Sequence, residues 1–277
     1  MQNRAGGRAN DAHKLLPAGR KAQIVAYVNS VDEATVAKLA EQFSVSQYTI
    51  RRDLDELDRQ GFLIRTHGGA VSALATAVPD SGFDIRLRTQ ARAKDHIGQL
   101  ASRLVEDNTA IIINSGTTAL SLARNLVDHR DLTVVTNNLR LPMEINEDAC
   151  RELHLFGGQI RLLSQATLGP VSLRVRDLDD IPIWCQTAFI GVGAVSSSFG
   201  YSTSNPREAA MMAEMMDAAQ TVVILADSCK FEEGLFARIA PLAAANILVS
   251  ETAPPPALQA ALDEAEVQVI YDESQLP

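Results

Sequence analysis

The chain has 277 residues, of which 46% are hydrophobic and 21% charged, and this composition excludes global disorder and suits more than one domain. Its net charge of −9 argues at first against nucleic acid as a partner, because phosphate backbones select for basic proteins. The charge is divided unevenly, however. Residues 1–72 hold 10 basic and 8 acidic residues, a net of +2, whereas the remainder holds 15 and 26, a net of −11. This asymmetry predicts two domains with different tasks.

Cysteine spacing and hydropathy exclude several classes of protein. Cys150, Cys185 and Cys229 form no CxxC pair, which excludes a disulfide framework and a zinc ribbon and fits a reducing compartment. Residues 1–10 lack the apolar segment of a secretory signal, and no apolar run approaches the ~18 residues that span a bilayer. We expect a cytoplasmic protein with no metal, no cofactor and no membrane partner, and we expect residues 1–15 to be disordered.

Residues 16–72, called the head, are predicted to form three short helices and a wing. Apolar side chains recur at helical spacing in residues 20–29 and again in residues 36–43. Ser46 is placed to cap a third helix over residues 46–60. Residues 63–71 are then expected to form two extended pieces around a Gly-Gly pair.

The third predicted helix is typical of a helix that inserts its N-terminus into a DNA major groove. Basic and amide side chains fill its first two turns and acidic side chains follow. An ordinary helix with a solvated charged face is the alternative, which the neighbouring helices and wing disfavour. Arg65 in the wing suits a phosphate, whereas His67 suits a turn equally well. The predicted DNA-contacting residues are Ser46, Gln47, Tyr48, Thr49, Arg51, Arg52, Arg65 and His67.

Residues 73–82 are Ala-rich and aperiodic, which predicts a linker, and residues 83–277, called the body, change in pattern. Short apolar runs rich in β-branched residues alternate there with helix-compatible stretches. This alternation predicts an α/β domain with a mostly parallel sheet covered on both faces. The predicted strands are 110–113, 132–136, 153–156, 187–190, 221–226, 247–249 and 267–271, and the predicted helices are 94–106, 119–127, 207–219 and 256–265.

Several predicted strands end in loops of glycine and polar residues. Open parallel sheets bind ligands at the carboxyl ends of their strands, so these loops predict one pocket. Ser115–Thr118 opens a helix and suits an anion, with a plain helix cap as the alternative. Lys230 suits a phosphate or carboxylate, with an exposed ion pair to Asp227 as the alternative. The predicted ligand-binding residues are Asn114, Ser115, Gly116, Thr117, Thr118, Asn137, Gly157, Gly158, Arg161, Gly191, Asp227 and Lys230.

Both halves of the chain resemble one known family. In the head, TIRRDL at 49–54 followed by RTHGGA at 65–70 resembles the N-terminal signature of the DeoR family of bacterial transcriptional regulators. In the body, SGTT at 115–118, VTNN at 135–138 and DSCKF at 227–231 resemble the sugar-phosphate-sensing domain of the same regulators.

The resemblance implies a winged helix-turn-helix joined to an α/β domain similar in fold to ribose-5-phosphate isomerase. It implies a regulator, most often a repressor of carbohydrate uptake or catabolism genes, that leaves operator DNA when a phosphorylated sugar or sugar alcohol binds near Ser115–Thr118 and Lys230. We expect a dimer or tetramer on double-stranded operator DNA. Asn114, Gln186 and Glu251 depart from the family pattern, which weakens the transfer of a particular effector.

A sugar-phosphate isomerase with an accessory head is the alternative function. Isomerisation needs a general base and a group that stabilises an enediolate, for which Glu208, Asp227 and Lys230 are candidates. Two observations argue against an enzyme. Position 186 holds Gln186 where the family usually has an acidic residue, and a long part of the chain is devoted to a DNA-binding domain. We therefore expect a regulator and not an enzyme.

Overall fold

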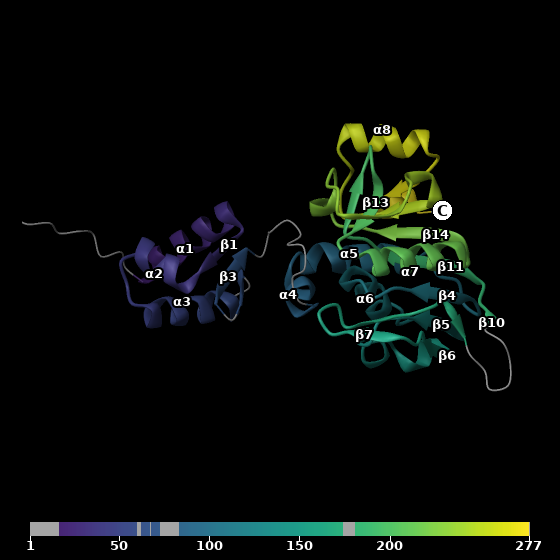
Figure 1. Ribbon diagram of the computed structural model, residues 1–277, viewed down its shortest axis with the longest axis horizontal. Helices are drawn as coiled ribbons and strands as arrows, with labels where there is room; N and C mark the ends of the chain where they lie inside the picture. The colour runs from purple at the N-terminus through teal and green to yellow at the C-terminus, as the bar shows by residue number, and fades with distance from the viewer. Residues whose placement is uncertain (1–16, 60–61, 67, 73–82, 174–180, 277) are drawn as a thin grey trace, which may run out of the picture. The chain divides into compact units, whose positions relative to one another are not determined.

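The computed structural model describes residues 17–59, 62–66, 68–72, 83–173 and 181–276. The chain forms two compact units, Met1–Ala75 and Thr76–Pro277 (Figure 1). The predictions for residues 1–15, for the 73–82 linker and for His67 lie outside the described residues.

The first unit contains the three predicted helices and a small antiparallel sheet. Its elements are α1 (Pro17–Val31), β1 (Glu33–Thr35), α2 (Val36–Gln42), α3 (Gln47–Arg59), β2 (Leu63–Arg65) and β3 (Gly69–Ser72). The strand β3 lies between β1 and β2, and β2 and β3 form the wing. The strand β1 was not predicted, because three residues are too few to show a periodicity.

Apolar spacing and one cap explain why α3 forms where it does. Ile50, Leu54 and Leu57 lie on one face of α3 and are buried in the core of the unit. The hydroxyl of Ser46 accepts a hydrogen bond from the backbone N–H of Thr49 at 3.1 Å, which confirms the predicted cap.

The second unit is built on a seven-stranded sheet in which every pairing is parallel. The strand order is β17-β16-β14-β11-β4-β5-β6. The prediction of a parallel α/β sheet is therefore confirmed. The strands are β4 (Ala110–Ile113), β5 (Leu132–Thr136), β6 (Cys150–Leu155), β11 (Cys185–Gly191), β14 (Ala219–Leu225), β16 (Ile247–Val249) and β17 (Gln268–Ile270).

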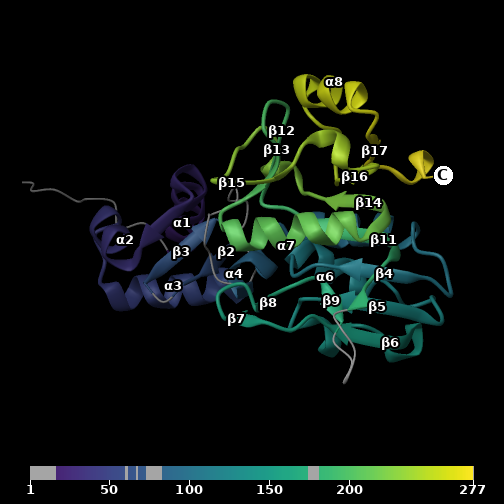
Figure 2. The same cartoon turned by 45° about the vertical axis from the view of Figure 1, so that its right-hand side comes forward.

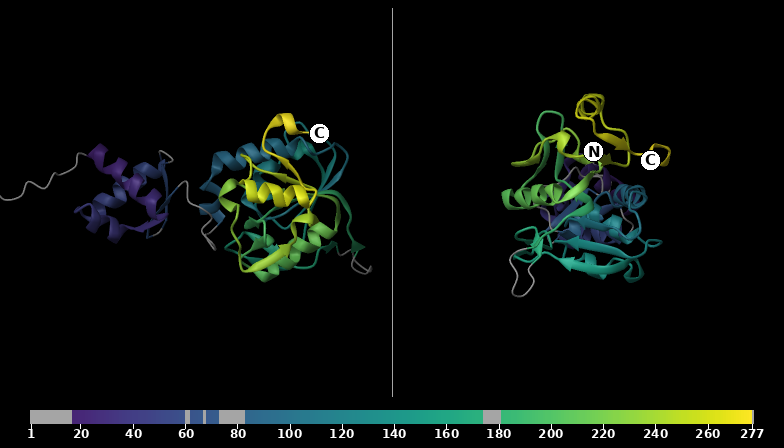
Figure 3. Two further views of the ribbon diagram at one scale, coloured as in Figure 1. Left: turned by 90° about the horizontal axis from the view of Figure 1, so that it is seen from above. Right: turned by 90° about the vertical axis from the view of Figure 1, so that its right-hand side faces the viewer.

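Helices cover both faces of this sheet (Figures 2 and 3). Ile112 packs on one face, whereas its neighbours Ile111 and Ile113 pack on the other, because successive residues of a strand point to opposite sides. All three are buried, which explains why the strands appear in the sequence as continuous apolar runs. One face carries α4 (Phe83–Arg88), α5 (Ala91–Ser102) and α6 (Thr117–Arg124), and the other carries α7 (Pro206–Asp217) and α8 (Pro256–Glu264).

Several short elements of the second unit were not predicted. They include α4, the hairpin β7–β8 (Gln159–Arg161 and Ala166–Leu168), the pair β9–β10 (Ser172–Leu173 and Ile181–Pro182) and the antiparallel sheet β12-β13-β15 (Ala194–Ser196, Gly200–Thr203 and Ala237–Ala240). The described residues of this unit also form 3-10 turns, namely η1 (Leu141–Met143), η2 (Glu147–Ala149), η3 (Ser228–Lys230), η4 (Leu242–Ala244) and η5 (Glu273–Gln275). Across the described ranges, no helix is long and apolar enough to cross a membrane.

Candidate DNA-binding surface and ligand pocket

The N-terminal half of α3 presents polar side chains to solvent. Gln47, Arg51 and Arg52 are exposed, and Tyr48 is 76% exposed. The hydroxyls of Ser46 and Thr49 lie 2.9 Å apart at the start of the helix. Two guanidinium groups, an amide and a phenol thus lie on the part of a helix that meets base edges and phosphates in a major groove.

The acidic half of α3 binds the rest of its own unit. Asp53, which is 5% exposed, accepts from the guanidinium of Arg20 on α1 at 2.7 Å. The carboxylate of Asp58 accepts from the backbone N–H of Arg65 at 2.9 Å, which joins α3 to the wing. The order of basic and then acidic residues along α3 therefore separates a solvent-facing part from a part that holds the unit together.

Arg65 is held by α3. Its guanidinium forms an ion pair with Asp55 and donates to the carbonyl oxygen of Arg51 at 3.3 Å. The cation of the wing therefore lies beside the exposed start of α3 while it shares its charge with a carboxylate. Its predicted contact with phosphate stays a prediction.

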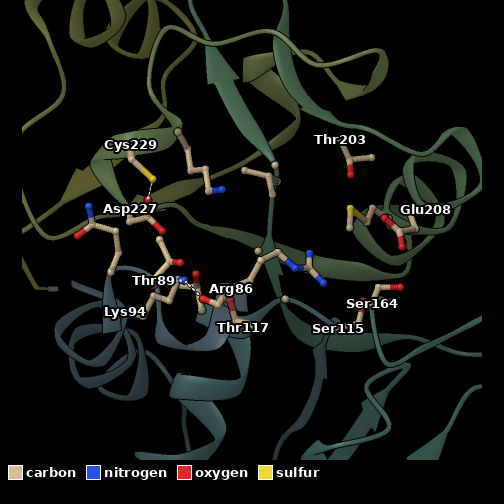
Figure 4. A pocket seen from close by; sticks show the side chains of 18 residues that line it. Arg86, Thr89, Lys94, Ser115, Thr117, Ser164, Thr203, Glu208, Asp227 and Cys229 are labelled. Atoms are coloured by element: carbon tan, nitrogen blue, oxygen red, sulfur yellow. Dashed lines mark hydrogen bonds between the residues drawn. The ribbon is translucent and has the colours of Figure 1, made fainter. Parts of the chain in front are cut away.

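A pocket in the second unit lies at the carboxyl ends of three adjacent strands (Figure 4). The strands β14, β11 and β4 are neighbours in the sheet, and the loops that follow them meet there. These loops contribute seven of the predicted ligand-binding residues to the lining, namely Ser115, Gly116, Thr117, Thr118, Gly191, Asp227 and Lys230.

The other predicted ligand-binding residues lie outside the lining of this pocket, and three of them do so because of strand order. Asn137 follows β5, and Gly157 and Gly158 follow β6, and these two strands lie on the far side of β4. Asn137 donates through Nδ2 to the carbonyl oxygen of Thr167 at 3.0 Å. Gly158 has a φ of +126°, and a Cβ there would overlap the backbone of Leu168.

The remaining two predicted residues support the pocket from outside. Asn114 is fully buried, and its Oδ1 accepts from the backbone N–H of Gly116 at 3.3 Å. Arg161 forms an ion pair at 3.1 Å with Glu208, whose carboxylate lines the pocket. Both residues therefore contact a residue that lines the pocket.

One end of the pocket suits an anion. The helix α6 begins at Thr117, and no side chain among the described residues caps its N-terminus. The first N–H groups of a helix carry a partial positive charge and need acceptors. Ser115, Thr117 and Thr118 line the pocket at this point. Backbone N–H groups and hydroxyls there are the donors that bind a phosphate at a helix N-terminus.

Three cationic side chains line the same pocket, namely Arg86, Lys94 and Lys230. Lys94 is 6% exposed, and its burial lowers its pKa to about 8, an effect that Asp227 opposes and Lys230 increases. The ammonium of Lys94 donates to the carbonyl oxygens of Arg86 and Thr89, the latter at 2.6 Å. These three cations outnumber the two carboxylates of the lining, Asp227 and Glu208, so the balance of charge favours an anionic ligand.

Elsewhere in the pocket, buried acceptors remain without partners in the described part of the chain. Oδ2 of Asp227 and the hydroxyl of Ser164 have none, although the two residues are 1% and 2% exposed. The other carboxylate oxygen of Asp227 accepts from the thiol of Cys229. Figure 4 shows Asp227 on one side of the pocket and Ser164, Thr203 and Glu208 on the other. Such groups are satisfied when a ligand supplies hydroxyls.

Two positions that depart from the family pattern have structural roles. Gln186 lies at the start of β11, at the edge of the sheet opposite the pocket, and its Oε1 accepts from the backbone N–H of Ala110 at 2.8 Å. It therefore bears on neither ligand choice nor catalysis in the pocket. Glu251 accepts from the backbone N–H of Ser228 at 3.0 Å, which supports the turn η3 that carries Lys230.

The predicted ligand-binding set lacked 11 residues of the pocket lining, most of which lie outside the strand-end loops. Lys94 could have been found, because only it and Lys230 of the five lysines lie beyond the head. Arg86, Thr89, Gln90, Ser164 and Thr203 lie on or beside short elements with no periodicity, whereas Glu208 and Met212 lie on the predicted helix α7. Glu208 was named only as a candidate for the alternative enzyme. The other residues absent from the prediction are Arg86, Thr89, Gln90, Lys94, Ser164, Val192, Gly193, Thr203, Met212 and Cys229.

Comparison with known proteins places both units. Residues 20–76 match the DeoR-like helix-turn-helix domain, and residues 89–252 match the DeoR C terminal sensor domain. The chain is 30% identical to the HTH-type transcriptional regulator GlpR of Haloferax volcanii over 86% of this chain and 91% of that protein. It is 25% identical to the Glycerol-3-phosphate regulon repressor of Escherichia coli over 89% of this chain and 95% of that protein.

Among solved structures, ribose 5-phosphate isomerase A from Methanocaldococcus jannaschii is similar over 50% of this chain and 53% of that chain, with a TM-score of 0.33 and 16% identity. A likeness this low carries no argument about activity. The two domain matches and the long alignments to transcriptional regulators decide the family. The chain belongs to the DeoR family of transcriptional regulators, with an N-terminal helix-turn-helix DNA-binding domain and a C-terminal sensor domain.

Proposed function

We propose that the protein represses genes of carbohydrate uptake or catabolism and leaves its operator when a phosphorylated sugar or sugar alcohol binds the pocket. The observation that carries this proposal is that one pocket combines an anion-binding helix start with buried acceptors and hydroxyls. A ligand that fits both has a phosphate at one end of a polyhydroxylated chain.

The anion-binding end supports a phosphate in particular. The uncapped start of α6 and the hydroxyls of Ser115, Thr117 and Thr118 provide several donors directed at one place. Lys94 and Lys230 add positive charge beside them. A phosphate group has enough acceptor oxygens to use all of these donors at once, whereas a carboxylate has only two oxygens.

The buried acceptors and hydroxyls of the lining support a sugar or sugar alcohol over inorganic phosphate. Oδ2 of Asp227 is a buried acceptor, and leaving it unpaired costs free energy that a ligand hydroxyl restores. Ser164 and Thr203 line the pocket with further hydroxyls.

On the DNA side, we propose that α3 enters the major groove with Gln47, Tyr48, Thr49, Arg51 and Arg52 near base edges and phosphates. The chain acts as a dimer or tetramer on paired half-sites, because the weak positive charge of one head favours avidity. Ligand binding changes the DNA affinity by a coupling free energy of about 1–3 kcal/mol, the usual range for such regulators.

A thermal-shift screen of the full chain tests the ligand class. The panel contains triose, pentose and hexose phosphates and sn-glycerol 3-phosphate, with each unphosphorylated parent and inorganic phosphate as controls. We expect a phosphorylated compound to raise the melting temperature more than its parent and more than inorganic phosphate. Lys230→Ala should weaken that binding about 10–100-fold, as the loss of a charged hydrogen bond does, whereas the exposed Arg92→Ala should not.

Release from DNA is measured by fluorescence anisotropy on a duplex selected with the full chain from a random library. Arg51→Ala should weaken DNA binding without changing the melting temperature. Lys230→Ala and Thr117→Ala should each abolish release by the compound found in the screen. Release that persists in both variants would show that the effector binds elsewhere.

A further inference from the structure

One wall of the pocket belongs to the first described element after the connection between the two units. The helix α4 begins at Phe83, directly after residues 73–82, which join the units along the chain and lie outside the described residues. Arg86 lies on α4, and Thr89 and Gln90 follow it, and all three line the pocket. Residues 83–90 therefore both line the pocket and directly follow the segment that leads from the head.

Lys94 holds the C-terminal end of α4. Its ammonium donates to the carbonyl oxygens of Arg86 and Thr89. The last carbonyls of a helix lack partners within it, and a cation beside them stabilises that end. An ammonium has three N–H donors, and these carbonyls take two of them. Because Lys94 also lines the pocket, a bound anion and the end of α4 share one cation.

The N-terminal end of α4 is held by groups that adjoin the pocket. The backbone N–H of Phe83 donates to the carbonyl oxygen of Leu163 at 3.0 Å. The guanidinium of Arg140 lies 5.9 Å from the centre of the Phe83 ring, which is 3% exposed. The residue after Leu163 is Ser164, which lines the pocket with a hydroxyl that has no partner in the described part of the chain.

The composition of α4 suits an element that rearranges. It has six residues, and Phe83 is its one buried side chain. Short elements with few buried apolar side chains open at the low end of the stability range of a fold. Leu87 also packs, partly buried, against the core on this face of the sheet, and the contact with Lys94 holds the C-terminal end of the helix.

We propose that α4 carries ligand occupancy from the pocket to the DNA-binding unit, with Lys94 as the coupling residue. A phosphate at the start of α6 attracts the ammonium of Lys94, the hydrogen bonds to Arg86 and Thr89 weaken, and the C-terminal end of α4 opens. Because α4 has only six residues, the loss of this contact loosens the whole helix, including Phe83, the residue from which the chain leads back toward the head. This inference rests on the proposed function and adds the residues that transmit its signal.

Hydrogen exchange on the full chain with saturating inorganic phosphate tests the transmission step separately from sugar recognition. Binding is verified by calorimetry on the same samples. We expect phosphate to slow exchange at Thr117 and Thr118 and to speed exchange in residues 86–90 by about fivefold or more. Lys94→Gln should show fast exchange in residues 86–90 without phosphate and no further change when phosphate is added. The exposed Arg92→Gln on the same helix is the matched control and should behave as the unmodified chain.

Two outcomes overturn the proposal and identify which step failed. Protection at α6 with unchanged exchange in residues 86–90 would leave the pocket intact and refute α4 as the transmitter. Absence of phosphate binding by calorimetry would remove the anion site and both proposals with it. If Lys94→Gln does not fold, Arg140→Gln provides the second test, because it loosens Phe83 from outside the pocket. It should retain phosphate binding within about twofold and lose most of the ligand-induced release from DNA.

Discussion

The carboxamide of Asn114 forms two hydrogen bonds with the backbone of Gly191. Its Nδ2 donates to the carbonyl oxygen at 2.8 Å, and its Oδ1 accepts from the N–H at 2.9 Å. This pairing joins the end of β4 to the end of β11 beneath the ligand pocket. An amide satisfies a carbonyl and an N–H together, whereas an ionised carboxylate cannot donate to the carbonyl.

Asn114→Asp should therefore destabilise the second unit by about 1–3 kcal/mol at neutral pH, because a buried carboxylate would face the carbonyl oxygen of Gly191. The loss should shrink at acidic pH, where the protonated carboxyl group donates. Denaturant unfolding at two pH values measures both effects. Asn108→Asp, at an exposed position, is the control and should change stability little. Equal stability of the Asn114 variant and the unmodified chain at neutral pH would contradict the role assigned to this amide.

Asp53→Asn should destabilise the head by about 1–3 kcal/mol, because the guanidinium of Arg20, which is largely buried, would lose its charged partner. Glu56→Gln breaks the neighbouring ion pair with Lys21. Because the side chain of Glu56 is 38% exposed, this change should lower the free energy of unfolding by only about 0–1 kcal/mol. Thermal unfolding of the two variants, followed by a probe in the head, compares these pairs directly. Similar losses for both would mean that burial does not govern the strength of these ion pairs.

Asp55→Asn should strengthen DNA binding at low salt, because it releases the guanidinium of Arg65 from its ion pair. The slope of log affinity against log salt should steepen by about one counterion, and Arg65→Ala should reduce the slope below that of the unmodified chain. Anisotropy titrations across a range of salt concentrations give these slopes. If neither variant changes the slope, Arg65 serves the structure of the wing and does not contact phosphate.

Affinity for a phosphorylated ligand should fall by up to about tenfold per pH unit as the pH rises through about 8, where Lys94 loses its proton. The charged groups that act on Lys94 are Asp227, Lys230, Cys229 and Arg86. Calorimetry at several pH values measures the fall, which Lys94→Met should remove and Cys229→Ser should retain. A fall that persists in Lys94→Met would assign the titration to another group.

The same pKa shift has the opposite effect on the stability of the ligand-free chain. Lys94 titrates near 10.5 when unfolded and near 8 when folded, so the unfolded chain binds more protons between these values. The free energy of unfolding should therefore rise with pH across this window, and Lys94→Met should flatten the rise. Ligand affinity and ligand-free stability thus change in opposite directions for one physical reason.

Much of the fold could be predicted because the relevant information is local. In the head, the buried stripe of Ile50, Leu54 and Leu57 repeats at helical spacing, and Ser46 marks the start of its helix. In the body, the strands are buried on both faces, so each appears as a short continuous apolar run. The position of the loop Ser115–Thr118 at the end of a strand could be predicted for the same reason, since it follows such an apolar run.

Tertiary structure alone decided which of these loops form the pocket. Parallel strands all end at one edge of the sheet, but neighbouring strands lie about 5 Å apart, so strand order sets which loops meet. The order β14-β11-β4 brings Asp227, Gly191 and Thr117 together, whereas Asn137 and Gly158 follow strands beyond β4. The sequence alone determined the two domains, most of their longer helices, the strands of the parallel sheet and the chemistry of the strand ends. The pairing of strands far apart in the chain decided the pocket, because no local pattern encodes which strands become neighbours.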